Sequence, residues 1–328
     1  MSELRAIPGN NVDPGSYSKQ MVDDRQLLTN RDYVLMTAAH NEEAFIEKTI
    51  KSVLAQTLLP KRWVIVSDGS TDRTDEIIES YAREQQLICF LKLTRPAGRQ
   101  FASKGIALQK GVKLLEGVSF GFIGNIDADI AVEPAYFATL LEHFERDPQL
   151  GLAAGFIYEE SDGVFRSRAA NRTDSIPHAA QMVRRECYEM IGGYSIFKYG
   201  GEDWYAQQCA KMNGWHAEAI PELQILHGRH TGTAGNLLKH QFRLGRLDYS
   251  FGSDPVFEFL KCAVRISERP RLLGALTRFL GFAWSSACRE SRPVSNEFVQ
   301  FLRKEQRSKV LNMFRGKSRD NVLRLENR

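Results

Sequence analysis

The stretch Val118-Ser119-Phe120-Gly121-Phe122-Ile123-Gly124-Asn125-Ile126-Asp127-Ala128-Asp129 joins an apolar run to two carboxylates that are one residue apart. The run is typical of a buried strand, and alternate side chains of an extended segment point the same way. Hard cations such as Mg²⁺ and Mn²⁺ prefer carboxylate oxygens and keep positions open for substrate phosphates. Asp127 and Asp129 therefore predict a divalent metal site at a strand end, with a solvated turn as the alternative.

Short β-rich segments alternate with longer helical ones around this stretch. We expect strands over Tyr33 to Ala38, Arg62 to Ser67, Ile88 to Leu93 and Val118 to Ile126. We expect helices over Glu42 to Gln56, Asp72 to Gln85, Arg99 to Leu115 and Asp203 to Asn213. The alternation predicts an α/β fold whose mostly parallel central sheet is flanked by helices. Ligands of such sheets bind at the carboxyl ends of the strands.

The composition is that of a globular protein, since 43% of the 328 residues are hydrophobic. The five cysteines include no Cys-x-x-Cys pair, so we expect reduced thiols and a cytoplasmic location. The first 31 residues are polar and lack the apolar core of a signal peptide, which predicts a loose N-terminal arm. No apolar stretch reaches the ~20 residues that cross a bilayer.

The charge is divided unevenly along the chain. Residues 239–328 carry 19 Lys and Arg against 9 Asp and Glu, a net +10, whereas the whole chain carries +4. A basic segment fits an anionic surface, either nucleic acid or the inner leaflet of the plasma membrane. Nucleic acid is the poorer fit, because the segment has no recognisable binding motif or aromatic platform.

We expect the basic segment to be helical over Asn236 to Ser250, Pro255 to Ile266, Pro270 to Arg289 and Ser295 to Met313. In the third helix, apolar residues recur on one face at Leu272, Leu276, Phe279, Leu280, Ala283 and Ala287. Arg271, Arg278, Ser285 and Arg289 lie on another face. The stripe could pack on its own domain or lie in a membrane interface as a peripheral anchor. We divide the chain into an arm (1–31), a catalytic domain (32–232) and a helical basic extension (233–328).

Four polar clusters follow predicted elements in a fixed order: Asn41-Glu42-Glu43, Asp68-Gly69-Ser70-Thr71-Asp72, Asp127-Ala128-Asp129 and Glu202-Asp203-Trp204. This order resembles that of the family-2 inverting glycosyltransferases of the GT-A fold, of the bacterial polysaccharide type. The resemblance covers about Tyr33 to His230. Ala38 to Glu43 is similar to the family's Pro-Ala-Tyr-Asn-Glu-Glu, and Ser67 to Asp72 is similar to its Asp-Asp-Gly-Ser-Thr-Asp.

The resemblance implies roles for individual residues. Asp203, beside Glu202, would be the general base that deprotonates the acceptor hydroxyl, and Trp204 would contact the acceptor. Asp127, Asp129 and His227 would hold Mn²⁺ or Mg²⁺ on the donor diphosphate. The nucleotide sugar, with a UDP-sugar favoured, would contact Ala39, Asn41, Glu42, Asp68, Ser70, Arg99, Lys104 and Asp127. The acceptor would be a saccharide or a lipid-linked precursor in cell-surface or exopolysaccharide synthesis.

The chain departs from the family pattern where Ser67 replaces an aspartate and Ala38 replaces a proline. Some residues also have structural alternatives: Arg99 and Lys104 as surface cations, Trp204 as helix core and His227 as a packed imidazole.

Two other functions compete. A nucleotidyltransferase would need a basic, glycine-rich loop directly after the first strand, where this chain has Asn41-Glu42-Glu43. A catalytically silent sugar-nucleotide or membrane-binding module would not need Asp127, Asp129, Glu202 and Asp203. The sequence therefore favours sugar transfer.

Overall fold

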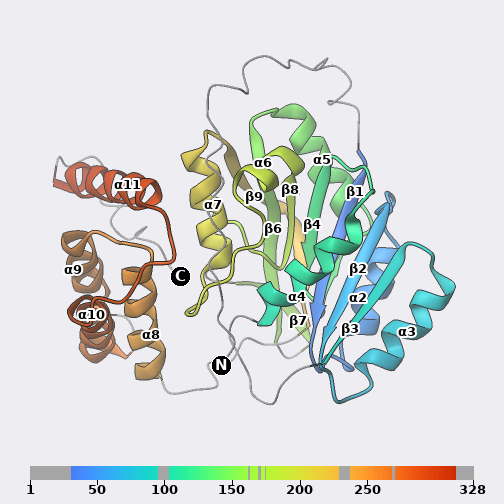
Figure 1. Cartoon of the computed structure of the whole chain (residues 1–328), viewed down its shortest axis with the longest axis horizontal. Coiled ribbons are helices and arrows are strands. Elements are labelled where there is room, and N and C mark those ends of the chain that lie inside the picture. Colours follow the sequence, from blue (N-terminus) through green and yellow to red (C-terminus); the bar gives the residue numbers. More distant parts are fainter. Residues whose placement is uncertain are drawn as a thin grey trace, which may run out of the picture.

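The computed structural model describes residues 31–94, 103–161, 163–168, 171–173, 175–228, 237–267 and 270–314. Its strands form one nine-stranded sheet in the order β3-β2-β1-β4-β8-β6-β9-β5, with β7 paired to β6. Figure 1 shows helices on both faces of the sheet and a group of C-terminal helices to one side. The strands are β1 (Tyr33–Ala39), β2 (Arg62–Asp68), β3 (Ile88–Leu93), β4 (Phe122–Ile126), β5 (Ile130–Val132), β6 (Leu150–Ser161), β7 (Val164–Ser167), β8 (Ala180–Arg184) and β9 (His216–His227).

The four strands predicted from the sequence form a continuous parallel half of the sheet. β1 pairs in parallel with β2 and with β4, and β2 pairs in parallel with β3. The α/β class is therefore confirmed. Beyond β4 the sheet is mixed, because β8 runs antiparallel to both β4 and β6, while β6 and β9 are parallel. The carboxyl ends of β1, β2 and β4 lie at one edge of the sheet, where the predicted polar clusters begin.

Two apolar cores lie on opposite faces of the sheet. The core beneath α2 (Ile46–Leu54), α3 (Thr74–Glu84) and α5 (Tyr136–Arg146) includes Ile50, Ile78 and Phe137, which point inward from these helices. The core on the other face includes Leu108 of α4 (Ser103–Val112), Cys187 of α6 (Arg185–Met190) and Ala210 of α7 (Glu202–Met212). Both cores hold the strand ends in fixed positions.

The C-terminal helices add a further layer behind α7. They are α8 (Leu237–Ser250), α9 (Pro255–Val264), α10 (Arg271–Ala287) and α11 (Asn296–Phe314), with a short 3₁₀ turn, η3 (Arg265–Ser267), after α9. A third core joins Cys209 of α7 to Leu247 of α8 and Phe298 of α11. No helix among the described residues combines the length and the apolar character that a membrane span needs.

The structure decides which of the two predicted faces of α10 is buried. Arg278 and Ser285, which we placed on the polar face, are buried against the neighbouring helices, whereas Leu272, Leu276 and Leu280 are exposed. The apolar stripe therefore does not pack on its own domain. Arg278 is buried because two buried carboxylates of α8 and α9 surround it.

Some predicted boundaries also differ. The helix expected from Glu42 begins at Ile46, because Asn41 adopts a left-handed φ of 56° and the next residues form a turn. The strand expected from Val118 begins at Phe122. Residues 1–30, 95–102 and 229–236 lie outside the described residues, so the arm, the domain boundaries and the role of Arg99 stay predictions.

Candidate functional site

Asn41 joins the loops that follow β1 and β2. Its Oδ1 accepts a hydrogen bond of 2.8 Å from the backbone N–H of Thr71, and its own N–H donates to Ser70 Oγ. The backbone N–H of Glu42 donates to Thr74 Oγ1 at 2.7 Å. The two motifs that resemble the family signatures therefore form one connected rim, which places Asn41, Glu42 and Ser70 together.

Ser67, which departs from the family pattern, is buried beneath this rim. Its hydroxyl donates to Asp75 Oδ1 at 2.5 Å and lies 2.9 Å from Ser70 Oγ. Asp68 follows directly, and its backbone oxygen contacts the ring of His40 at 2.8 Å. Ala39 is also buried, so it could contact a nucleotide through its backbone only. In this chain the packed serine supports the rim from below.

Asp127 lies in a network of polar side chains at the end of β4. Its Oδ1 lies 2.5 Å from Lys104 Nζ and accepts a hydrogen bond of 3.0 Å from Asn125 Nδ2. Asn125 Nδ2 also donates to the backbone oxygen of His178 at 2.7 Å. Lys104 is thus paired with Asp127 while 40% of its side chain stays exposed, and its role at the phosphates stays a prediction.

Asp129 contacts the third predicted metal residue. The antiparallel pairing of β5 and β9 sets Ile130 opposite His227 and so brings His227 Nε2 to 3.1 Å from Asp129 Oδ2. This hydrogen bond is the main cause that raises the pKa of His227 above its ordinary value. Carboxylate and imidazole donors fit a divalent cation that also binds diphosphate oxygens. The described residues hold no cluster of three or more such ligands, since Asp127 faces Lys104 instead.

Glu202 and Asp203 begin α7. Gly201 precedes them with a φ of 90°, and a Cβ there would approach the Phe251 ring, so glycine alone suits this tight entry. Glu202 Oε1 accepts a hydrogen bond of 3.3 Å from the N–H of Phe197, and burial raises the pKa of Glu202. Asp203 Oδ1 accepts from the N–H of Trp204 at 2.8 Å. The two neighbouring carboxylates therefore have different surroundings.

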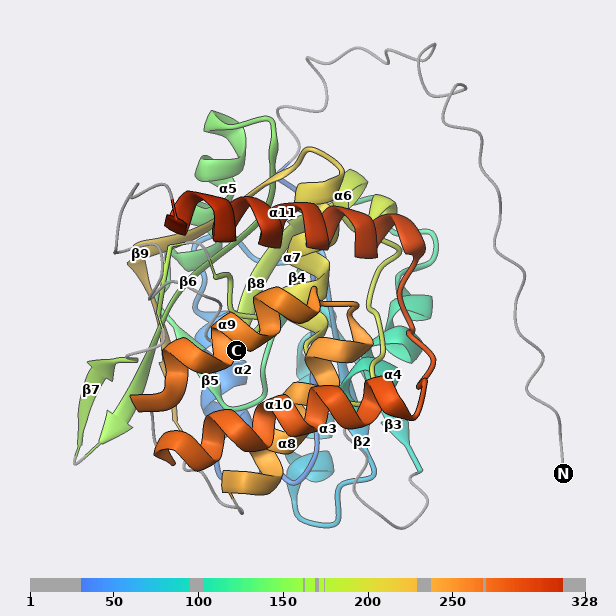
Figure 2. The ribbon, with the colours of Figure 1, turned by 90° about the vertical axis from the view of Figure 1, so that its left-hand side faces the viewer.

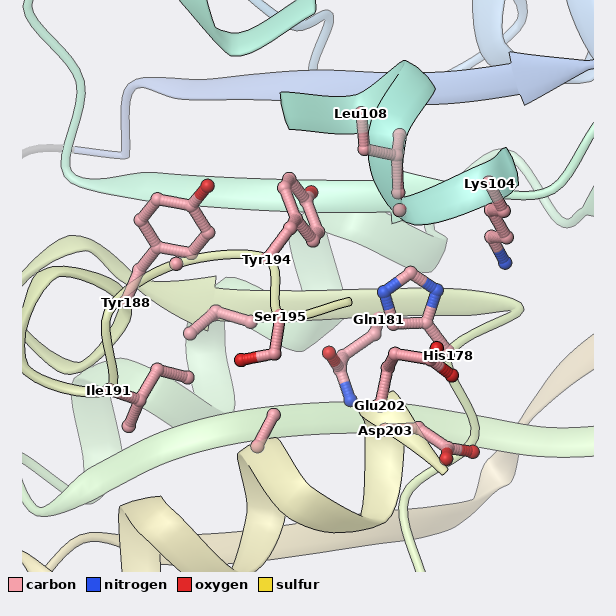
Figure 3. A pocket seen from close by; sticks show the side chains of 14 residues that line it. Lys104, Leu108, His178, Gln181, Tyr188, Ile191, Tyr194, Ser195, Glu202 and Asp203 are labelled. Carbon is pink, nitrogen blue, oxygen red and sulfur yellow. The ribbon is translucent and has the colours of Figure 1, made fainter. Parts of the chain in front are cut away.

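A cavity of about 230 Å³ opens between α4, β8 and the start of α7. Figure 3 shows Lys104, His178, Glu202 and Asp203 at one end and Tyr188 and Ile191 at the other. Burial, and secondarily the charge of Lys104, lowers the pKa of His178 well below its ordinary value, which favours the neutral imidazole. The cavity thus has a polar end and an apolar end.

Gln181 lines the same cavity and has an unsatisfied amide. Its side chain is 3% exposed, and its Nε2 has no hydrogen-bond partner among the residues that the structure describes. A buried amide without a partner costs free energy, so such a group commonly awaits a ligand or an ordered water. Neither Gln181 nor His178, which lies just before β8, was predicted from the sequence, because β8 is short and lacks an alternating apolar pattern.

A second cavity of about 220 Å³ lies between α7 and α8, and Asp203 lines both cavities. His240 and Arg243 of α8 line it, and the Arg243 guanidinium donates to the backbone oxygen of Tyr199. Trp204 lines it as well, but its ring also packs on Phe251 at 5.3 Å. This packing agrees with the helix-core alternative for Trp204, whose acceptor role stays a prediction.

Comparison with known proteins assigns this chain to a family. Residues 35–201, just over half of the chain, match the family model described as glycosyl transferase family 2. The chain belongs to glycosyltransferase family 2. The matched residues include the rim at Asn41, the Asp127 to Asp129 loop and the glycines before Glu202. The family resemblance of the sequence is therefore confirmed.

Two curated relatives of this family-2 chain are similar over part of their length. An uncharacterized glycosyltransferase EpsJ of Bacillus subtilis is 33% identical over 153 residues, which are 46% of this chain and 42% of the relative. The poly-beta-1,6-N-acetyl-D-glucosamine synthase of Staphylococcus aureus is 32% identical over 120 residues, which are 37% of this chain and 27% of the synthase. The aligned part is thus less than half of each relative.

Two solved structures share the fold of the family-2 chain. Staphylococcus aureus TarS 1-349, solved in complex with UDP-GlcNAc, has a TM-score of 0.52 at 15% identity over 89% of both chains. GalNAc-T7, solved with UDP, GalNAc and Mn²⁺, has a TM-score of 0.52 at 14% identity over 82% of this chain and 59% of that one. These likenesses confirm the GT-A fold.

Proposed function

We propose that the chain transfers a sugar from a nucleoside diphosphate to an acceptor hydroxyl with inversion of the anomeric carbon. The observation that carries this proposal is the position of Asp203 in the wall shared by two cavities. A carboxylate there can face a sugar in the first cavity and a hydroxyl that enters from the second. Family membership and the carboxylates after β4 support the same chemistry.

The nucleotide would lie along the rim after β1 and β2, with Asn41, Glu42, Asp68 and Ser70 at its nucleoside end. A UDP-sugar is the favoured donor. Asp129 and His227, with Asp127 beside them, would hold Mn²⁺ or Mg²⁺, which when bound neutralises the diphosphate and makes it a better leaving group. Lys104, at 2.5 Å from Asp127, would place a further positive charge next to the diphosphate.

Asp203 would act as the general base. The acceptor oxygen forms a bond to the anomeric carbon, the bond from that carbon to the phosphate oxygen breaks, and the acceptor proton passes to Asp203. The electron pair of the broken bond leaves with the diphosphate. Glu202 is the less suitable base, because it lines only the first cavity, whereas Asp203 also lines the cavity from which the hydroxyl would enter.

The transferred sugar would occupy the 230 Å³ cavity. Gln181 Nε2 would donate to an oxygen of the sugar, and the apolar wall at Tyr188 and Ile191 would contact a nonpolar part of it. An N-acetylated hexose has both features in one substituent, a carbonyl oxygen and a methyl group. An N-acetylated hexose is part of UDP-GlcNAc, the ligand of the similar TarS structure. It is also the repeating sugar in the name of the staphylococcal synthase.

The acceptor would enter the second cavity, where His240 and Arg243 offer donors to a saccharide or to the phosphate of a lipid-linked precursor. We place this reaction on the cytoplasmic side of the membrane, in cell-surface or exopolysaccharide synthesis.

A release assay tests the proposal. The protein is incubated with a panel of UDP- and GDP-sugars, with Mn²⁺ or Mg²⁺, and with or without lipid-linked saccharide acceptors. We expect metal-dependent release of UDP that an acceptor accelerates, and fastest release from a UDP-N-acetylhexosamine. In a parallel incubation with nucleoside triphosphates and sugar 1-phosphates, formation of pyrophosphate would instead identify a nucleotidyltransferase. No turnover in either incubation would identify a silent binding module.

A further inference from the structure

The C-terminal helices bury charged side chains in their interior. Lys261 Nζ lies 2.9 Å from Asp248 Oδ2 and 2.6 Å from Glu258 Oε2, and Arg278 Nη2 lies 2.8 Å from the same Asp248 oxygen. All four side chains are at most 2% exposed. Ordinary soluble domains rarely bury such a network, since desolvation of the charges is costly even when they are paired.

The same helices expose large apolar side chains on their outer face. Leu272, Leu276, Leu280 and Trp284 recur every four residues along α10 and are 50–61% exposed. This spacing lines them up on one side of the helix. Four more large apolar side chains are exposed nearby: Val256 and Phe259 of α9, Ile266 of η3 and Leu273 of α10. We call these eight residues the outer apolar face.

The outer apolar face is continuous across α9 and α10. The rings of Phe259 on α9 and Phe279 on α10 lie 5.9 Å apart, which joins the two helices at this side. Figure 2 shows both helices at the front of the molecule when the C-terminal layer faces the viewer. Contiguous exposed apolar surface of this kind marks a docking site for a membrane or a protein.

The exposed, unpaired charges near this face are positive among the residues that the structure describes. Arg271, Arg289 and Arg292 are exposed at its edges. Among the described residues from 254 to 292, the carboxylates of Asp254 and Glu258 are buried, and that of Glu290 is paired with Arg246. An apolar face with a cationic edge complements a surface that combines anionic headgroups with acyl chains.

We propose that the outer apolar face of α9 and α10 docks on an anionic lipid bilayer, with its leucines, Phe259 and Trp284 inserted below the headgroups. The charge complementarity favours lipid over a second copy of the chain, because two copies would bring Arg271, Arg289 and Arg292 close to their counterparts. The buried ion network also fits this arrangement, since it keeps the carboxylates of Asp248 and Glu258 inside the helices and away from the bilayer.

The docked helices would hold the acceptor cavity at a fixed place relative to the membrane. α8 and α10 pack closely at Gly245 and Gly281, where a Cβ would collide with the backbone of Arg278 and of Phe242, respectively. α8 carries His240 and Arg243 into the second cavity. The close packing of α8 on α10 therefore links the docking surface to that cavity, which suits an acceptor that is itself anchored in lipid.

Vesicle binding tests the docking directly and does not depend on the proposed reaction. We expect the full chain to sediment with vesicles of phosphatidylcholine that contain about one-third phosphatidylglycerol. The variant L272Q/L276Q/L280Q should bind at least about 10-fold more weakly, because interfacial binding scales with buried apolar area. The variant R271Q/R289Q should lose about 5-fold for each arginine. The matched control L59Q/V164Q/M190Q, with three exposed apolar residues outside α8 to α11, should bind like the parent.

Trp284 reports on insertion itself. Trp63 is buried, and Trp284 is the tryptophan with the large exposed surface. Brominated lipids should quench part of the tryptophan fluorescence of the parent, and this quenching should be absent in W284F. The comparison separates insertion of Trp284 from adhesion of the protein to the headgroups. Both leucine and arginine variants should keep the parent's affinity for UDP, so loss of docking and failure of the proposed sugar transfer give different results.

Three results would overturn the proposal. The parent chain does not bind anionic vesicles, or the leucine variant binds them as strongly as the parent. Alternatively, sedimentation velocity finds a dimer that the leucine substitutions dissociate while Trp284 stays unquenched by lipid, which would identify a second copy as the occupant.

Discussion

His227 Nε2 lies 3.1 Å from Asp129 Oδ2 although 98 residues separate them in the chain. The contact follows from sheet topology, since β9 returns beside β5 and its last residue pairs with Ile130. Both side chains are about 15% exposed, so the pair faces the rim of the site and is not sealed in the core. This geometry suits a bound cation with open positions for a diphosphate.

Asp129→Ala and His227→Ala should each weaken binding of UDP in the presence of Mn²⁺ by at least about 10-fold, because each removes a donor to the cation. Isothermal titration of UDP with and without Mn²⁺ measures this. His216→Ala is the matched control, since His216 also contacts an aspartate, Asp147, at 2.7 Å but lies at the start of β9. Equal affinity of all three variants and the parent would reject the metal assignment.

Gln181→Leu should raise the KM for the sugar donor by about 10-fold, because it removes one hydrogen bond to a buried polar group. Affinity for UDP without the sugar should not change. The thermal midpoint should stay the same or rise, since leucine removes an amide that lacks a partner. If the substitution lowers stability and leaves the KM unchanged, Gln181 is a structural residue and the cavity does not hold the sugar.

Arg278→Met should lower the free energy of unfolding by about 3–5 kcal/mol, because it leaves Asp248 buried next to a single remaining cation, Lys261. Urea denaturation followed by circular dichroism measures the change. Arg83→Met is the control, since Arg83 forms an exposed pair with Glu79 that contributes little. A loss for Arg278→Met as small as that of the control would mean that the network does not stabilise the C-terminal layer.

The parallel half of the fold was predictable because its signals are local. β1 to β4 are apolar segments bounded by turn residues, and β3 was placed to the residue. β8 could not be predicted, since its position between β4 and β6 depends on pairing with strands that lie far along the chain. The buried side of α10 could not be predicted for a similar reason. Helical periodicity separates two faces but does not tell which one the buried carboxylates of α8 and α9 attract.

Within the site, the family motifs gave the residue types but not their contacts. Asp127 was expected on the metal, and the structure pairs it with Lys104. Gln181 and His240 reach the two cavities from a short strand and from a helix beyond the family match, so no motif marks them. Such residues become visible only when the chain is folded.

Single-turnover transfer by Asp203→Asn, compared with Glu202→Gln, tests the central claim most directly. Asparagine keeps the size and the hydrogen bond to the N–H of Trp204 but cannot take the acceptor proton, so transfer should fall by about 10²- to 10⁴-fold at unchanged UDP affinity. Glu202→Gln should retain more activity, since Glu202 mainly holds the Phe197 loop. Loss of turnover in Glu202→Gln with full turnover in Asp203→Asn would move the base by one residue, and full transfer by both variants would contradict the proposed inverting mechanism.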